Sequence, residues 1–268
     1  MKKVVSILVF VFIFAAMAGC SGGSSSGSGT NRNAGLLDPT TFTVGVEIGY
    51  PPFEMYDDAN EPIGFDIDLA KEIAKILGVK FAYQDTAWDG IFAGLNVDKY
   101  DAVISAVTIR ADRQLTMDFS EPYIENWQAI AVRKGSPAVT SLEGLEGLNV
   151  GLQASTTSHD LLDEMIELKL VSCSIAPYVQ VLNAFDDLRL GRVDCVLTDS
   201  TVAEGYVGRE PDNFEITWHQ KNEPGAEAER FGVAMKKGNA ALVNAVNDAL
   251  RQLEASGRLD ELRGMWLQ

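Results

Sequence analysis

The chain has 268 residues, with 38 acidic and 22 basic side chains and a formal net charge of −16 at neutral pH. An acidic protein of this kind lacks the lysines and arginines that bind nucleic-acid phosphates, so we expect no nucleic-acid partner. The roughly 230 residues beyond the N-terminal segment exceed one typical core and predict two lobes.

The N-terminus has the pattern of a secretory signal peptide. Lys2 and Lys3 precede an apolar run over 4–16 that is too short for a comfortable membrane span and is followed by small residues. The ending Ala18-Gly19-Cys20 resembles the cleavage box of bacterial lipoproteins, in which the cysteine is lipidated. We expect residues 1–19 to be a signal peptide, and 20–37 to be lipidated Cys20 with a Ser/Gly tether. The alternative is an ordinary signal peptide with a chance cysteine.

From residue 41 onward, apolar runs alternate with amphipathic segments, which predicts parallel sheets with helical crossovers. Asp66 is the expected N-cap of the first helix. In the first half the pattern predicts strands over 42–47, 79–83 and 102–105, with helices over 66–77 and 88–95. In the second half it predicts strands over 149–153, 171–175 and 194–197, with helices over 158–168 and 181–190. Two further helices are expected over 242–254 and 257–266.

The same order of elements in both halves defines the expected lobes. Lobe one comprises 38–126 together with 228–268, and lobe two comprises 127–227. The chain must therefore cross between them twice, near 125–128 and 227–231. Trp127 and Gln128 at the first crossing have two open interpretations, hinge packing or lining of a cleft.

Polar residues follow the expected strands. Ligands of open α/β sheets bind outside the carboxyl ends of strands, so the stretches 47–53, 105–113, 153–158 and 198–199 should meet at one cleft. They bring two acids, hydroxyl groups, the start of a helix, an aromatic side chain and Arg113. An arginine just past a strand end can hold a carboxylate by two parallel hydrogen bonds, and a helix start favours an anion. A surface arginine on a turn is the alternative for Arg113.

Several residues have no single interpretation. Cys173 and Cys195 each lie in an apolar run, so they form either a disulfide in an oxidising compartment or buried free thiols. Arg110 and His159 either face the cleft or lie on the surface. No metal or cofactor site is expected.

Motifs along nearly the whole chain resemble the periplasmic amino-acid-binding proteins of ABC importers. The motifs are VGVEIGYPPFE (44–54), GFDIDLAKEIAKILG (64–78), WDGIFAGL (88–95), DAVISAVTIRADR (101–113), MDFSEPY (117–123), LEGLNVGLQASTT (145–157) and VDCVLTDSTVA (193–203). The resemblance implies an α/β, two-lobed periplasmic-binding-protein fold of type II. Each lobe is then a mostly parallel sheet flanked by helices, and two hinge crossings join the lobes.

The resemblance also implies a set of ligand-binding residues. Each residue is expected to contact one part of an amino-acid ligand: its α-carboxylate, its α-ammonium group, or its side chain including the far end. For the carboxylate the residues are Arg113, Thr108 and Thr157; for the ammonium, Asp199, with Ser105 and Ala106 supplying hydroxyl and carbonyl groups; for the side chain, Tyr50, Trp88 and Glu47; Gln153 belongs to the set without an assigned partner. Ser155 departs from the glycine that is usual in the family.

These roles favour a basic amino acid, arginine or lysine, because two aromatic side chains and Glu47 suit a cationic group. Glutamine and cystine remain open, and an acidic ligand is disfavoured. We expect a monomer that is not an enzyme, held outside the cell membrane by its lipid alone and delivering its ligand to permease subunits. The alternatives are a secreted dehydratase acting on prephenate or arogenate, and a ligand-sensing subunit of a receptor.

Overall fold

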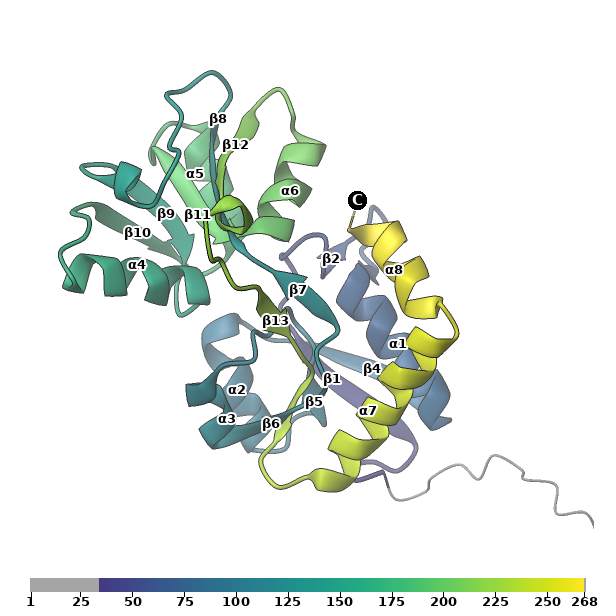
Figure 1. The fold of residues 1–268 in the computed structure, drawn as a ribbon. Coiled ribbons are helices and arrows are strands. Elements are labelled where there is room, and N and C mark those ends of the chain that lie inside the picture. Colours follow the sequence, from purple (N-terminus) through teal and green to yellow (C-terminus); the bar gives the residue numbers. More distant parts are fainter. Residues whose placement is uncertain (1–33, 268) are drawn as a thin grey trace, which may run out of the picture. The chain divides into compact units, whose positions relative to one another are not determined.

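The computed structural model describes residues 34–267 (Figure 1). The predicted signal peptide, Cys20 and most of the predicted tether lie outside this range. Residues 34–267 belong to one compact unit that contains two five-stranded sheets. No helix within these residues is both long and apolar enough to span a membrane.

The first sheet has the strand order β4-β1-β5-β14-β6, and four of its five strands run in one direction. Its strands are β1 (Thr41–Val46), β4 (Lys80–Asp85), β5 (Ala102–Val103), β6 (Met117–Phe119) and the reversed β14 (Ala234–Lys236). Its helices are α1 (Phe65–Leu77), α2 (Trp88–Asn96), α3 (Ala111–Thr116), α7 (Ala240–Ala255) and α8 (Arg258–Trp266). The helices α1, α7 and α8 pack on one another, and the apolar side chains of β1 are fully buried.

The second sheet has the order β10-β9-β11-β8-β12, again with four strands in one direction. Its strands are the reversed β8 (Gln128–Arg133), β9 (Asn149–Gln153), β10 (Ser174–Tyr178), β11 (Cys195–Asp199) and β12 (Phe214–His219). Its helices are α4 (Thr157–Glu167), α5 (Val181–Arg189), α6 (Ser200–Arg209) and the short η1 (Glu143–Leu145) and η2 (Gln220–Asn222). The mostly parallel, two-lobed α/β class that the sequence predicted is confirmed.

Two short strands carry the chain between the sheets. The strands β7 (Ile124–Asn126) and β13 (Glu229–Phe231) pair antiparallel, with Glu229 opposite Asn126. A small hairpin of β2 (Met55–Tyr56) and β3 (Pro62–Ile63) precedes α1. The crossings therefore form one paired ribbon, while the exact lobe boundaries stay a prediction.

Three local expectations are corrected by the structure. The cap position of α1 is Gly64, and the side chain of Asp66 is buried beneath the loop after β5, where it accepts the backbone N–H of Ala106. The strand expected over 171–175 begins only at Ser174, because the apolar Val171 belongs to the packed turn before it. The strand expected over 102–105 ends at Val103, since Ser105 and Ala106 turn into the site described below.

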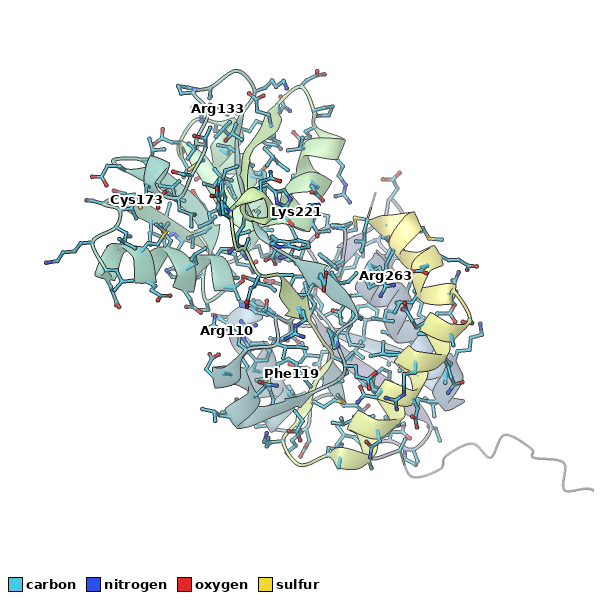
Figure 2. The ribbon with its side chains drawn as sticks, viewed as in Figure 1. Arg110, Phe119, Arg133, Cys173, Lys221 and Arg263 are labelled. Carbon is cyan, nitrogen blue, oxygen red and sulfur yellow. The ribbon has the colours of Figure 1, made fainter. Side chains whose placement is uncertain are left out.

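Cys173 and Cys195 are free thiols. Cys195 is fully buried in β11, and burial raises the pKa of its thiol to about 12. Cys173 (Figure 2) is half-buried in the loop before β10. Of the two alternatives that the sequence left open, the structure shows the unpaired one.

Gly64 gives the first testable prediction. Its φ of 130° disfavours any side chain, and an added Cβ would lie 2.2 Å from the backbone oxygen of Phe53. We expect Gly64→Ala to lower the free energy of unfolding by about 3 kcal/mol, measured by urea unfolding. Gly90→Ala is the matched control, because nothing lies within 4 Å of the added Cβ in α2. It should leave stability unchanged or raise it by up to about 1 kcal/mol, and equal effects of the two substitutions would contradict the prediction.

Candidate functional site

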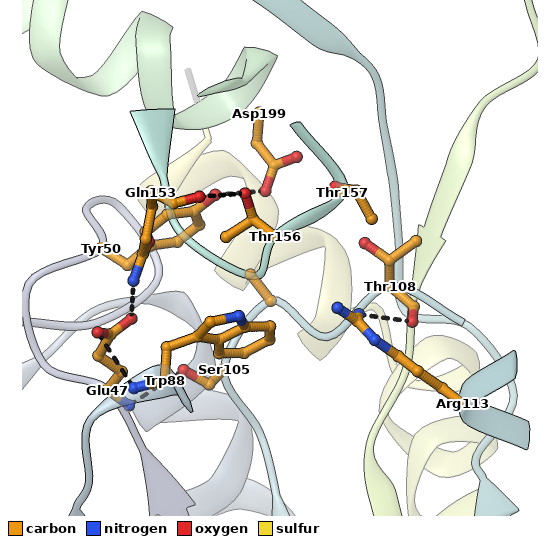
Figure 3. A pocket seen from close by; sticks show the side chains of 11 residues that line it. Glu47, Tyr50, Trp88, Ser105, Thr108, Arg113, Gln153, Thr156, Thr157 and Asp199 are labelled. Carbon is orange, nitrogen blue, oxygen red and sulfur yellow. Dashed lines mark hydrogen bonds between the residues drawn. The ribbon is translucent and has the colours of Figure 1, made fainter. Parts of the chain in front are cut away.

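A pocket of about 310 Å³ lies where the carboxyl ends of β1, β9 and β11 meet (Figure 3). Its lining residues are Glu47, Tyr50, Trp88, Ser105, Ala106, Thr108, Arg113, Gln153, Thr156, Thr157 and Asp199. All ten residues that the sequence analysis selected for ligand binding therefore meet in one pocket, and Thr156 joins them. Their roles toward a ligand stay a prediction.

Glu47 is a buried acid at the end of β1, with 3% of its surface exposed. Its carboxylate accepts hydrogen bonds from the Gln153 side-chain amide at 2.7 Å and from the backbone N–H of Trp88 at 3.4 Å. Burial raises its pKa to about 7, against the lowering effect of those two bonds. Among residues 34–267, no lysine, arginine or histidine forms an ion pair with it. A cationic group in the pocket would therefore find an acid without a counter-ion.

Asp199 is the second buried acid and lies at the end of β11. It accepts hydrogen bonds from the Tyr50 hydroxyl at 2.5 Å, the Asn126 amide at 2.8 Å and the Gln128 amide at 2.9 Å. Burial raises its pKa, and those donors together with the positive charge of Arg113 act in the opposite direction. Three neutral donors hold the carboxylate in place, but none of them neutralises it.

Arg113 is the cation of the pocket and comes from α3. Its guanidinium donates to the Thr108 carbonyl at 3.1 Å and lies 5.4 Å from the ring centre of Trp88. Burial lowers its pKa, and within the described residues no carboxylate forms an ion pair with it. In the close-up view Trp88 lies between Glu47 and Arg113 (Figure 3). The pocket thus separates its positive end from an acidic end by an aromatic side chain.

The start of α4 completes the positive end. Thr156 is the N-cap and accepts the N–H of His159, while the first turn of the helix leaves other N–H groups for an anion. Ser155 has a φ of 60°, the left-handed region in which glycine is favoured. Its N–H donates to the His159 ring at 3.1 Å and its carbonyl accepts the Trp88 indole N–H at 2.9 Å. These bonds hold Ser155 in a backbone conformation that glycine would adopt more readily.

Two buried acids that were not among the predicted ligand-binding residues, Glu54 and Asp66, hold the loop after β5 that lines the pocket. The Ser105 hydroxyl donates to Glu54, and the Ala106 N–H donates to Asp66 at 2.6 Å. Burial raises the pKa of Asp66 to about 7, and burial together with the nearby Asp66 raises the pKa of Glu54 well above its usual value. Ala106 is held at a φ of 46°, which a non-glycine residue adopts only at a cost. The acids therefore position the loop that lines the pocket.

Further residues link the two sides of the pocket. Arg110 (Figure 2) forms an ion pair with Asp160 of α4, and the Gln180 side chain donates to the Ile48 carbonyl at 3.2 Å. Gln128, fully buried in β8, donates to Asp199, Thr157 and Glu229. Trp127 lies outside the lining and contacts Lys221 instead. The sequence left Gln128 open between hinge packing and cleft lining, whereas the side chain of Glu229 was missed because a single sequence does not show which faces of the crossing strands point to the pocket.

The fold and this pocket define a two-lobed α/β binding protein with a charged ligand pocket between its sheets. The chain belongs to the bacterial extracellular solute-binding proteins, family 3, whose family model matches residues 42–268. The family and the relatives named below are described as binding proteins. Within residues 34–267, no group of three or more His, Cys, Asp or Glu side chains is placed to hold a metal ion.

Individual relatives show how close the similarity is. The L-cystine-binding protein TcyJ of Escherichia coli is 32% identical over 227 residues, covering 84% of this chain and 82% of that protein. The ABC transporter arginine-binding protein 1 of Escherichia coli is 32% identical over 223 residues, covering 83% and 88%. Among solved structures, an ancestral arginine-binding protein bound to arginine has a TM-score of 0.79 and 38% identity, covering 85% of this chain and 98% of that one.

Proposed function

We propose that the protein binds a free basic amino acid, arginine or lysine, in this pocket and delivers it to an ABC importer. The main support is the set of charged side chains that line the pocket. They are one cation, Arg113, and two acids, Asp199 and Glu47, and none of them forms an ion pair in the described part of the chain. A basic amino acid has the complementary set, one carboxylate and two cationic groups. Each buried charge then gains a partner.

The geometry orders these pairings along the ligand. Its α-carboxylate takes Arg113 with the hydroxyls of Thr108 and Thr157, and its α-ammonium takes Asp199. The side chain then extends along Trp88 toward Glu47, since Trp88 lies between Arg113 and Glu47. Tyr50 and Trp88 supply aromatic surface for a cationic group, worth about 2 kcal/mol when desolvated.

Ligand binding and lobe closure are the same event in this proposal. Arg113 belongs to the segment after β5, whereas Asp199 belongs to β11 of the other sheet. A zwitterion contacts both only when the lobes are shut around it, so the ligand stabilises the closed state by the difference in its affinity for the two states. A micromolar complex of a ligand with about ten heavy atoms needs roughly 8 kcal/mol, within the per-atom limit for small ligands.

The relatives support an amino acid as the ligand, but they differ in which amino acid they bind. An arginine-binding protein and a cystine-binding protein are equally similar to this chain. Cystine also carries an ammonium group at its far end and is the main rival ligand. Glutamine is a weaker rival because its neutral amide leaves Glu47 unpaired.

The remaining parts of the proposal concern location and assembly. The signal peptide over 1–19 exports the chain, and lipid on Cys20 holds it at the outer face of the membrane through the tether of 20–37. The lobes are 38–126 with 228–268, and 127–227, and the protein acts as a monomer toward the permease. A catalytic role as a dehydratase is the alternative, and turnover of prephenate or arogenate would establish it.

Arg113 and Asp199 provide the first test. A thermal-shift screen of the twenty amino acids with cystine and ornithine should show one strongly stabilising ligand, by about 2.7 kcal/mol at a hundred times its Kd. We expect Arg113→Ala and Asp199→Asn each to remove the shift while the proteins remain folded. Arg251→Ala, on the exposed face of α7, is the control and should keep the shift. Full affinity in either pocket variant would exclude the role proposed for that residue.

Glu47 tests the ligand class separately. Glu47→Gln should weaken arginine binding about 30-fold, because about 2 kcal/mol is lost with a buried charge pair, and should leave glutamine binding within about threefold. Isothermal titration calorimetry with both ligands measures the difference. Undiminished arginine affinity, or a wild-type protein that prefers glutamine or cystine, would show that the pocket is not selective for a basic side chain.

A further inference from the structure

Glu229 is an acid of the crossing ribbon that uses hydrogen-bond donors of the pocket. One oxygen of its carboxylate accepts from the Thr108 hydroxyl at 3.4 Å and from the Thr157 hydroxyl at 3.3 Å. The other oxygen accepts from the Gln128 amide at 3.1 Å. Glu229 itself is not part of the pocket lining. Glu229 therefore binds, from outside the lining, the hydroxyls of Thr108 and Thr157, which in the proposed function donate to the ligand carboxylate.

The two hydroxyls cannot serve both acceptors. Each threonine hydroxyl has a single proton to donate, so donation to Glu229 excludes donation to a ligand carboxylate. The two contacts are also longer than the usual distance of about 2.7 Å between hydroxyl and acceptor oxygens. Glu229 thus holds these donors loosely, and a better placed carboxylate can take them.

The surroundings of Glu229 disfavour a second negative charge. The negative charge of Asp199 in β11 acts on Glu229. Burial together with that charge raises the pKa of Glu229 to about 7. Gln128 of β8 and the two threonines are the neutral groups around it. The charged residues beside it in the ribbon, Arg230 and Glu125, are exposed, and Arg113 forms no ion pair with it within residues 34–267.

We propose that Glu229 couples amino-acid binding to the uptake of one proton from solvent. A ligand carboxylate seated on Thr108 and Thr157 brings a further negative charge beside Glu229, and Glu229 accepts the proton that relieves the repulsion. Protonated Glu229 releases both hydroxyls as donors to the ligand. The inference rests on the proposed function, since it requires a carboxylate at this end of the pocket.

The direction of the pH dependence follows from the sign of each ligand charge. The carboxylate raises the pKa of Glu229 above about 7, so binding takes up a proton above neutral pH and affinity falls as the pH rises. A cationic side chain lowers the pKa of Glu47 from about 7, so binding releases a proton at lower pH. Above pH 7, proton uptake is therefore the signature of Glu229 and not of Glu47.

Calorimetry with L-arginine in phosphate and Tris buffers at pH 8.0 tests the coupling, because these buffers differ in ionisation enthalpy. We expect net uptake of about half a proton per ligand, and a Kd that rises about twofold between pH 7.0 and 8.0, because Glu47 offsets part of the effect of Glu229. Glu229→Gln should reduce the uptake to near the small value that L-arginine itself contributes, and its Kd should not rise between these two pH values. Glu125→Gln makes the same change at an exposed position of the paired strand β7 and should keep the wild-type uptake.

The possible results separate the two proposals. No buffer-dependent enthalpy in the wild-type protein overturns the coupling without any variant, and so does undiminished uptake in Glu229→Gln. Failure of the wild-type protein to bind any of the twenty amino acids or cystine overturns the proposed function and the coupling with it. Binding with the expected uptake, lost only in Glu229→Gln, supports both.

Discussion

The structure depends on one electrostatic constraint: three charged side chains converge on one pocket without ion-pair partners among residues 34–267. Arg113 lies beside Trp88 at one end, Glu47 lies at the other, and Asp199 is held by three neutral donors. Burying charges in this way is unfavourable unless something pairs them. A dipolar guest with an extra cation would pair all three at once, which is why the proposed function assigns a basic amino acid to this pocket.

The surrounding fold contains strained and buried polar residues that lower its stability and hold this arrangement in place. Ala106 and Ser155 adopt left-handed backbone conformations without being glycine, and each is fixed by a hydrogen bond from a neighbouring element. Asp66 and Glu54 are buried beneath the first of these loops, with their pKa values raised. Strain and buried acids of this kind persist where function requires them. The ribbon of β7 and β13 adds Glu229, which ties the hinge region to the donors of the pocket.

Much of this site was predictable because parallel strands place their carboxyl ends together. Glu47, Ser105, Gln153 and Asp199 all follow apolar runs, so the sequence alone indicated that they meet. Asp66 was misread as a helix cap because acids at helix starts usually cap, and only the tertiary structure shows the Ala106 N–H above it. The two crossings were predicted, but their pairing was not, because the strands β7 and β13 are three residues each and pair across about 100 residues of sequence, which leaves no local pattern.

A crystal structure of the protein with bound L-arginine tests the central claim most directly. The account predicts the α-carboxylate within hydrogen-bond distance of Arg113, the α-ammonium at Asp199 and the guanidinium at Glu47. A ligand in the reverse orientation, or one bound outside the pocket with these three side chains still unpaired, would contradict it.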